Sequence, residues 1–121
     1  MSPRILFISI LLFFQNDIIG QNLYVTNYTQ KEYGSSDYIT SPQNWDIEQD
    51  SLGRLYVANS SCVLLFDGLT WQMISGTENF NLYSLTKTNS NVIYAGGREE
   101  FGYFRSDSLG RIVFNSMVPL N

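Results

Sequence analysis

Two adjacent carboxylates, Glu99 and Glu100, and the arginine before them, Arg98, are the residues of this chain whose types could support chemistry. Hydrolysis of a glycosidic bond uses two carboxyl groups that lie about 5 to 10 Å apart and differ in pKa. Neighbouring residues of a strand point to opposite faces of the sheet, so an adjacent pair on a strand does not meet that requirement. We therefore interpret Glu99 and Glu100 as part of a solvated loop between two strands.

The rest of the composition excludes several other kinds of chemistry. The chain has no histidine and a single cysteine, Cys62, which removes the commonest general base, the commonest zinc ligand and an internal disulfide. It also has no glycine-rich phosphate loop, no Ser/His/Asp set and no EF-hand spacing. We expect a non-enzymatic chain with no catalytic residue, no metal site and no cofactor, in which Cys62 is a small core residue beside Val63.

Charge and hydropathy indicate the class of protein. Seven basic and eleven acidic residues give a net charge of −4, so the basic surface expected of a nucleic-acid binder is missing. A hydrophobic fraction of 44% with 15% charged residues is typical of a domain that folds around a core. The aromatic fraction of 15% favours strands and binding surfaces over helical bundles.

The N-terminal segment has the order of a secretory signal peptide. Arg4 is followed by a nearly continuous apolar run at residues 5–14, then by polar residues and Gly20. Such a run is far shorter than the ~20 residues that a membrane-spanning helix needs. We predict that residues 1–20 are a signal peptide cleaved near Gly20 or Gln21, the alternative being a buried N-terminal element. Export of a chain with an unpaired cysteine favours the bacterial periplasm.

After residue 43 the sequence repeats itself at an offset of 38 positions. The matching segments are 45–47 with 83–85, 55–58 with 93–96, and 63–66 with 101–104. Apolar and aromatic positions coincide while polar positions vary, which is typical of two copies of one supersecondary unit. We expect the matched aromatic residues to pack between the two units. These are Tyr56 with Tyr94 and Phe66 with Phe104. Trp45 and Tyr83 also match, and we expect them either to wedge adjacent units or to face a central channel.

Each unit is predicted to contain four short strands. Alternation and turn residues place them at 44–49, 55–59, 63–67 and 70–75, and at 82–88, 92–97, 101–105 and 111–117. Four antiparallel strands that repeat at about 40 residues are typical of a β-propeller blade. We therefore predict an all-β fold with a leader at 22–43, one strand near 23–28, blade 1 at 44–81 and blade 2 at 82–121. A β-sandwich is the alternative, although it does not explain the repeat.

An identical pentapeptide, Asp-Ser-Leu-Gly-Arg, occurs at residues 50–54 and 107–111. Its place in the repeating unit differs between the two occurrences, so it is not part of the repeat. We interpret it as a hairpin turn in which Gly53 and Gly110 supply the positive φ that such loops need.

Two blades do not complete a propeller, which closes with roughly four to eight. We expect the chain to be the N-terminal piece of a longer protein, a truncated product, or a protomer that must assemble. The exposed flanks of two blades also predict that residues 22–121 do not form a stable monomer.

The chain resembles the two-component regulator propeller family. The resemblance is carried by residues 43–47, 50–59, 65–68, Trp71 and 94–104, the last of which reads Tyr-Ala-Gly-Gly-Arg-Glu-Glu-Phe-Gly-Tyr-Phe. In this family a signal peptide precedes a periplasmic sensor propeller, which is followed by a triple-tyrosine domain, a membrane helix and a histidine kinase or helix-turn-helix regulator. The sequence departs from the family at residues 88–91, where such blades usually carry an Asp…Gly turn.

The resemblance implies that the chain is the N-terminal part of a non-catalytic, ligand-sensing propeller in the periplasm. Its partners are then the downstream blades, the triple-tyrosine domain, and a small-molecule or oligosaccharide ligand, with carbohydrate the usual ligand class. No nucleic-acid contact and no transmembrane helix are expected in this segment. The alternatives are a fragment of a secreted propeller hydrolase or lyase, and a structural repeat that binds another protein through an edge.

Loop residues that interrupt the repeat are the candidates for ligand binding, because repeat architectures place binding in the variable loops of one face. We expect Arg98 to donate hydrogen bonds to the ligand and the ring of Phe80 to stack on it. The candidates are Arg98, Glu99 and Glu100 in the central turn of blade 2, and Asn79, Phe80 and Asn81 in the linker between the blades.

Overall fold

The computed structural model describes residues 26–29, 33–34 and 40–120. The predicted signal peptide at 1–20 and the start of the predicted leader strand lie outside these residues. The described part of that strand, residues 26–28, carries no strand pairing. Within the described residues there is also no helix long and apolar enough to cross a membrane.

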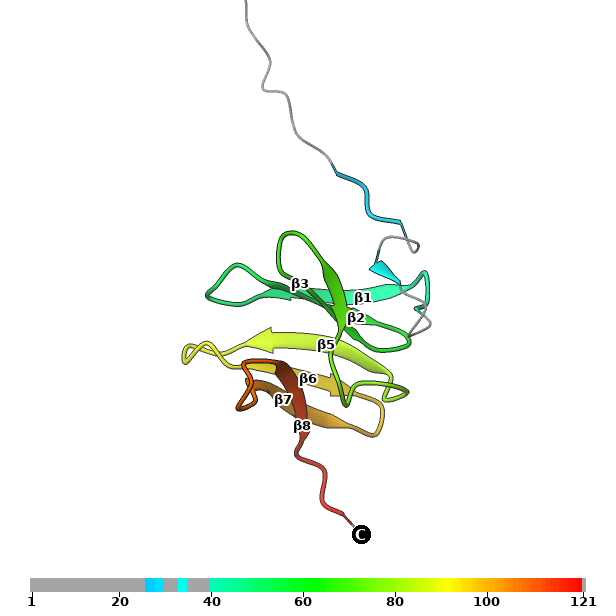
Figure 1. Ribbon diagram of the computed structural model, residues 1–121. Coiled ribbons are helices and arrows are strands. Elements are labelled where there is room, and N and C mark those ends of the chain that lie inside the picture. The colour runs from blue at the N-terminus through cyan, green and yellow to red at the C-terminus, as the bar shows by residue number, and fades with distance from the viewer. Residues whose placement is uncertain (1–25, 30–32, 35–39, 121) are drawn as a thin grey trace, which may run out of the picture.

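Eight strands form two four-stranded antiparallel sheets, each with its strands in sequence order (Figure 1). The first sheet contains β1 (Asn44–Gln49), β2 (Leu55–Asn59), β3 (Val63–Phe66) and β4 (Trp71–Met73). The second contains β5 (Leu82–Lys87), β6 (Ile93–Gly97), β7 (Phe101–Ser106) and β8 (Ile112–Ser116). The all-β prediction and the eight strands predicted in the two units are confirmed, with end points that differ by no more than two residues.

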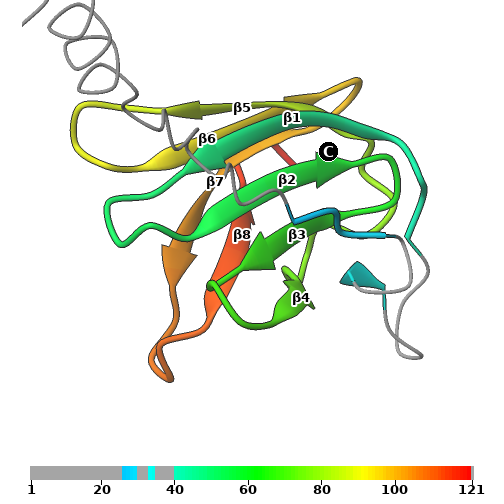
Figure 2. The same cartoon turned by 90° about the horizontal axis from the view of Figure 1, so that it is seen from above.

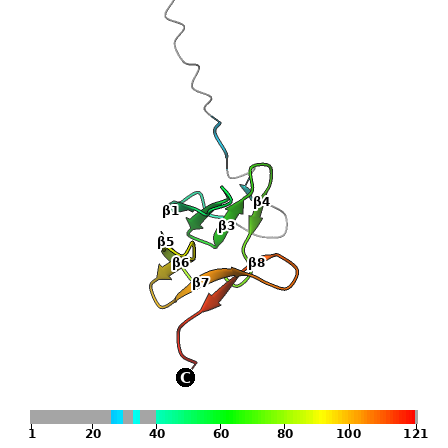
Figure 3. The same ribbon diagram turned by 90° about the vertical axis from the view of Figure 1, so that its left-hand side faces the viewer.

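The two sheets stack face to face as an open pair (Figure 3). The core between them is made of aliphatic and aromatic side chains from both sheets, because alternate residues of each strand point to the same face. The first sheet contributes Tyr56, Ala58, Val63 and Leu65, joined by Ile74 beyond β4, and the second contributes Leu82, Leu85, Ile93, Ala95 and Phe104. The first strands of the two sheets, β1 and β5, run side by side (Figure 2), linked by a hydrogen bond of 2.8 Å from the Leu85 N–H to the Asp46 carboxylate.

The prediction that all four matched aromatic residues pack between the units is correct for two and wrong for two. Tyr56 is 3% exposed, and its ring lies 5.3 Å from that of Phe104, between the sheets. Tyr94 is 38% exposed, and Phe66 stacks on Trp71 on the opposite side of the first sheet. Tyr56 and Phe104 face the other sheet, whereas their repeat counterparts Tyr94 and Phe66 lie on the outward faces.

The outward side of the first sheet has its own small cluster, formed by residues of β2, β3 and β4 together with the leader. Its members are Tyr33, Val57, Cys62 and Leu64, with Trp71 and Met73 packed against them. Cys62 is buried, as predicted. Burial, followed by the charge of Glu78, raises the pKa of its thiol to about 11, so the sulfur stays protonated at neutral pH.

Trp45 and Tyr83 meet at the junction of β1 and β5. Their rings form an edge-to-face pair with centroids 5.1 Å apart. The two matched residues thus contact each other between the units, and both side chains remain partly exposed, at 48% and 38%.

Candidate functional site

The six loop residues expected to bind a ligand line one pocket of about 300 Å³. The pocket lies where the β6–β7 turn meets the linker between β4 and β5. Asn79, Phe80 and Asn81 come from the linker, and Arg98, Glu99 and Glu100 come from the turn. Two segments that are separate in sequence thus converge on one surface.

A glycine allows the linker to approach the turn. A Cβ atom added at Gly97 would lie 2.3 Å from the backbone oxygen of Asn81, which no side chain tolerates. Gly97 also closes the turn by donating its N–H to the Glu100 carbonyl at 2.8 Å. Arg98 and Glu99 therefore form the tip of a two-residue hairpin loop, directly beside the linker.

The linker follows an irregular path that asparagine tolerates better than most residues. Asn79 and Asn81 have φ values of 66° and 48°, in the left-handed region. The Asn79 N–H donates to the Ser61 carbonyl of the first sheet at 3.3 Å. Between the two asparagines, Phe80 is 41% exposed, with its ring centroid 6.4 Å from that of Phe114.

The charged side chains of the pocket differ in their hydrogen bonds to the rest of the chain. One oxygen of Glu100 accepts hydrogen bonds from the Phe101 N–H at 2.9 Å and from the Ser116 hydroxyl at 2.6 Å. Arg98 and Glu99 have no hydrogen bond or ion pair within the described part of the chain. The guanidinium of Arg98 is therefore free to donate to a bound molecule.

The equivalent turn of the first sheet is engaged by its own surroundings. Asn59, the counterpart of Gly97, is fully buried, and its amide donates to the Ser41 carbonyl at 2.7 Å and to Asn44 at 2.8 Å. Ser60, the counterpart of Arg98, accepts a hydrogen bond from the Trp45 indole at 2.8 Å. Among the described residues, the first unit's turn is thus occupied by its own contacts, whereas the second unit's turn lines an open pocket.

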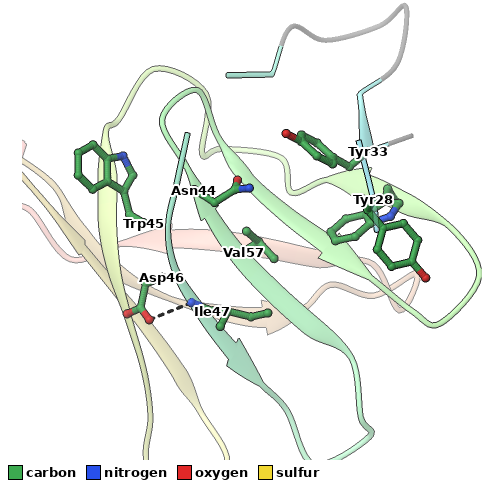
Figure 4. Close-up of a pocket in the computed structure, with 8 residues that line it drawn as sticks. Tyr28, Tyr33, Asn44, Trp45, Asp46, Ile47 and Val57 are labelled. Atoms are coloured by element: carbon green, nitrogen blue, oxygen red, sulfur yellow. Dashed lines mark hydrogen bonds between the residues drawn. The ribbon is translucent and has the colours of Figure 1, made fainter. Parts of the chain in front are cut away.

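A second, larger hollow of about 520 Å³ lies on the outward side of the first sheet and was missed by the sequence analysis. Figure 4 shows Val57 in its middle, between the rings of Tyr28 and Tyr33 and the β1 residue Ile47. Trp71 also lines it, and its indole N–H is buried without a partner among the described residues. The sequence signal was the regularly spaced tyrosines of the leader, of which Tyr28 and Tyr33 line the hollow.

The described residues contain no group of three His, Cys, Asp or Glu side chains placed to hold a metal ion. A scan against protein-family models, a search of curated proteins and a search of solved structures each found no match to the chain.

Proposed function

We propose that the chain is part of the ligand-sensing propeller of an exported, periplasmic two-component-type signalling receptor or transcriptional regulator, which binds its ligand without reacting with it. The observation that carries the proposal is the convergence of the six repeat-breaking residues on one pocket. A turn that served only to connect two strands would not need an unpaired arginine beside an exposed aromatic ring. Binding in such loops leaves the sheets free to act as a rigid scaffold.

The chemistry of the pocket fits a small polar ligand such as an oligosaccharide. The Arg98 guanidinium offers five N–H donors, and the Asn79 and Asn81 amides offer both donors and acceptors. The exposed ring of Phe80 provides an apolar surface on which a sugar ring can stack. Glu99 supplies a free carboxylate that accepts from ligand hydroxyl groups.

Two loop variants test this function. Arg98→Ala is expected to weaken binding at least about tenfold, because a hydrogen bond to a charged group contributes about 1.5 to 3 kcal/mol. Phe80→Ala is expected to weaken binding because it removes the apolar surface on which the ligand stacks. Binding of a panel of oligosaccharides is measured by isothermal titration calorimetry, with thermal unfolding measured in parallel. Arg98 is exposed and unpaired, so its replacement should not change the melting temperature, whereas Phe80→Ala also removes the ring beside Phe114 and should lower it slightly.

Arg105→Ala is the matched control, since it removes an exposed arginine of β7 that does not line the pocket. It should bind as the wild type does. If the two loop variants bind every oligosaccharide that the wild type binds with unchanged affinity, the loops are connectors and the proposal is wrong.

A further inference from the structure

The hollow on the outward side of the first sheet stays open with the leader in its place. Val57 lies in its middle and Ile47 borders it on the β1 side (Figure 4). On the other side, the leader rings of Tyr28 and Tyr33 pack on Trp71, with centroids 5.4 and 5.8 Å from the Trp71 ring. The leader is therefore one wall of the hollow and does not fill it.

Rings and aliphatic groups make up most of the lining, and part of this apolar surface is in contact with water. Ile47 is 58% exposed and Tyr28 is 44% exposed. Pockets that hold small molecules have such apolar walls and volumes of about 300 to 1,000 Å³. The hollow, at about 520 Å³, is of that size. A flat ring that enters it removes apolar surface from water, which is favourable.

Asn44, which lines the hollow, offers a hydrogen-bond donor. The amide oxygen of Asn59 accepts from the N–H groups of Ser41 and Ser61 at 3.0 and 3.1 Å, which fixes the direction of the Asn59 NH₂ group. That NH₂ group donates to the amide oxygen of Asn44 at 2.8 Å. The oxygen of Asn44 is thus occupied, and its own NH₂ group has no partner among the described residues.

Trp71 supplies a second donor. Its indole N–H is buried and has no acceptor in the described part of the chain. A buried N–H without an acceptor costs free energy in the protein without a ligand. Because the Tyr28 ring packs on Trp71 at the side of the hollow, a ligand that displaces this ring can bring an oxygen atom to the N–H.

The charge of the hollow excludes an ionic ligand. Among the described residues that line it, Asp46 alone is charged. One oxygen of Asp46 accepts from the Ile47 N–H and the other from the Leu85 N–H, both at 2.8 Å. The carboxylate is therefore engaged in the fold, and no cationic side chain among the lining residues is present to hold an anion.

We propose that the hollow is a second binding site, which takes a flat, neutral ring compound that carries oxygen acceptors. The ligand ring lies on Val57 and Ile47 beside the leader tyrosines. Its oxygen atoms accept from Asn44 and Trp71, the two donors that the fold leaves unpaired. The site uses none of the six loop residues, so it goes beyond the proposed ligand sensing and does not depend on it.

Two probes of similar shape test the site. Coumarin has two fused rings with a ring oxygen and a carbonyl oxygen, whereas naphthalene has the rings alone. Isothermal titration calorimetry of the full chain should show tighter binding of coumarin. In nuclear magnetic resonance spectra the chain gives two indole N–H signals, from Trp45 and Trp71, and Trp71→Phe identifies them. The Trp71 signal should shift downfield with coumarin, because its N–H gains an acceptor.

Three variants locate the contacts. Ile47→Ser removes apolar surface and should weaken binding of both probes about fourfold or more, the factor that corresponds to one buried CH₂ group. Leu69→Ser is the matched control, because Leu69 is an exposed aliphatic residue that does not line the hollow. Trp71→Phe keeps a ring and removes the N–H, so it should weaken coumarin binding about two- to tenfold and naphthalene binding less. If circular dichroism shows that Trp71→Phe is unfolded, Asn44→Asp takes its place, since it keeps the acceptor for Asn59 and removes the NH₂ group.

The outcomes separate this site from the loop pocket. Arg98→Ala should bind coumarin as the wild type does, and a loss of binding there would overturn the proposal. Absence of coumarin binding at about 1 mM would also overturn it. So would unchanged binding by Ile47→Ser, or equal affinity of the wild type for the two probes. If coumarin binds in the hollow and no oligosaccharide binds the chain, the second site is upheld and the proposed sensing function is wrong.

Discussion

The same five residues build the β1–β2 turn at 50–54 and the β7–β8 turn at 107–111, in two different surroundings. In the first, one oxygen of Asp50 accepts from the N–H groups two and four residues later, at 3.0 and 2.9 Å. In the second, Asp107 accepts from the equivalent groups, both at 2.9 Å. The backbone φ angles of Gly53 and Gly110 are 82° and 78°. Local sequence alone is therefore sufficient to fix this turn.

The side chains of the two turns differ in what surrounds them. Arg54 and Arg111 both pair with the aspartate of their own turn, but their side chains are 27% and 71% exposed respectively. Asp50 additionally accepts a hydrogen bond of 3.2 Å from the hydroxyl group of Tyr56, whose ring is in the core. The first turn is thus tied to the interface between the sheets, and the second serves as a surface connector.

The ionisation of the two aspartates reflects this difference. Burial raises the pKa of Asp50, but the hydrogen bonds and charge of Arg54 outweigh it, so the pKa lies below its ordinary value. The N–H of Arg111 is the main cause that lowers the pKa of Asp107. For Tyr56, burial is the main cause of a pKa raised to about 12, and Asp50 adds to it. Only the first turn couples its charge to a core residue.

Replacement of the aspartate should produce the largest difference in unfolding free energy between the two turns. Asp50→Ala leaves the Tyr56 hydroxyl and the Arg54 guanidinium without their acceptor, at a cost of about 2 to 4 kcal/mol in unfolding free energy. Asp107→Ala should cost a small fraction of that, since water replaces its partners. Urea denaturation of both variants measures the difference. Equal losses would mean that the turn geometry, and not the link to the core, determines stability.

Removal of one hydroxyl group should sharpen the comparison. Tyr56→Phe keeps the ring packed on Phe104 and deletes only the hydrogen bond to Asp50, so we expect a loss of about 1 kcal/mol. Tyr94→Phe is the matched control at the repeat position, where the hydroxyl group has no partner among the described residues, and should be near neutral.

A double-mutant cycle between Tyr56→Phe and Asp50→Ala then isolates the pair, because residues in direct contact show non-additive effects. Additive effects would show that Tyr56 and Asp50 stabilise the fold independently.

The strands and turns could be predicted from the sequence because they are local. Alternation of apolar residues defined the strands, and the pentapeptide contains every group that its turn needs, from the aspartate acceptor to the glycine with positive φ. The repeat also placed Trp45 opposite Tyr83. The six pocket residues were found because they interrupt that repeat.

The burial of repeated positions could not be predicted in the same way. Tyr56 and Tyr94 occupy the same place in their units, and only the presence of a neighbouring sheet distinguishes them. The acceptor role of Asp46 toward β5 was missed because it depends on how the two sheets are stacked. Nor could the convergence of the linker on the β6–β7 turn be foreseen, since it requires the close approach that Gly97 allows.

Acid should weaken both turns, and this is the smallest effect we expect. Each aspartate has a folded-state pKa below its ordinary value. The unfolded chain, with aspartate pKa values near about 3.9, therefore binds more protons, so the contribution to stability is present above about pH 4 and is lost as the pH falls through the folded-state pKa. Urea midpoints of Asp50→Asn and Asp107→Asn should fall less steeply than the wild type below about pH 4, and run parallel to it between about pH 5 and 7.

Added salt should reduce the difference for the Asp107 variant more than for the Asp50 variant, because ions screen an exposed pair more effectively than a buried one. If neither substitution makes the urea midpoint less dependent on pH below about 4, other carboxylates cause the acid sensitivity. The two turns would then differ in their contacts but not in their titration.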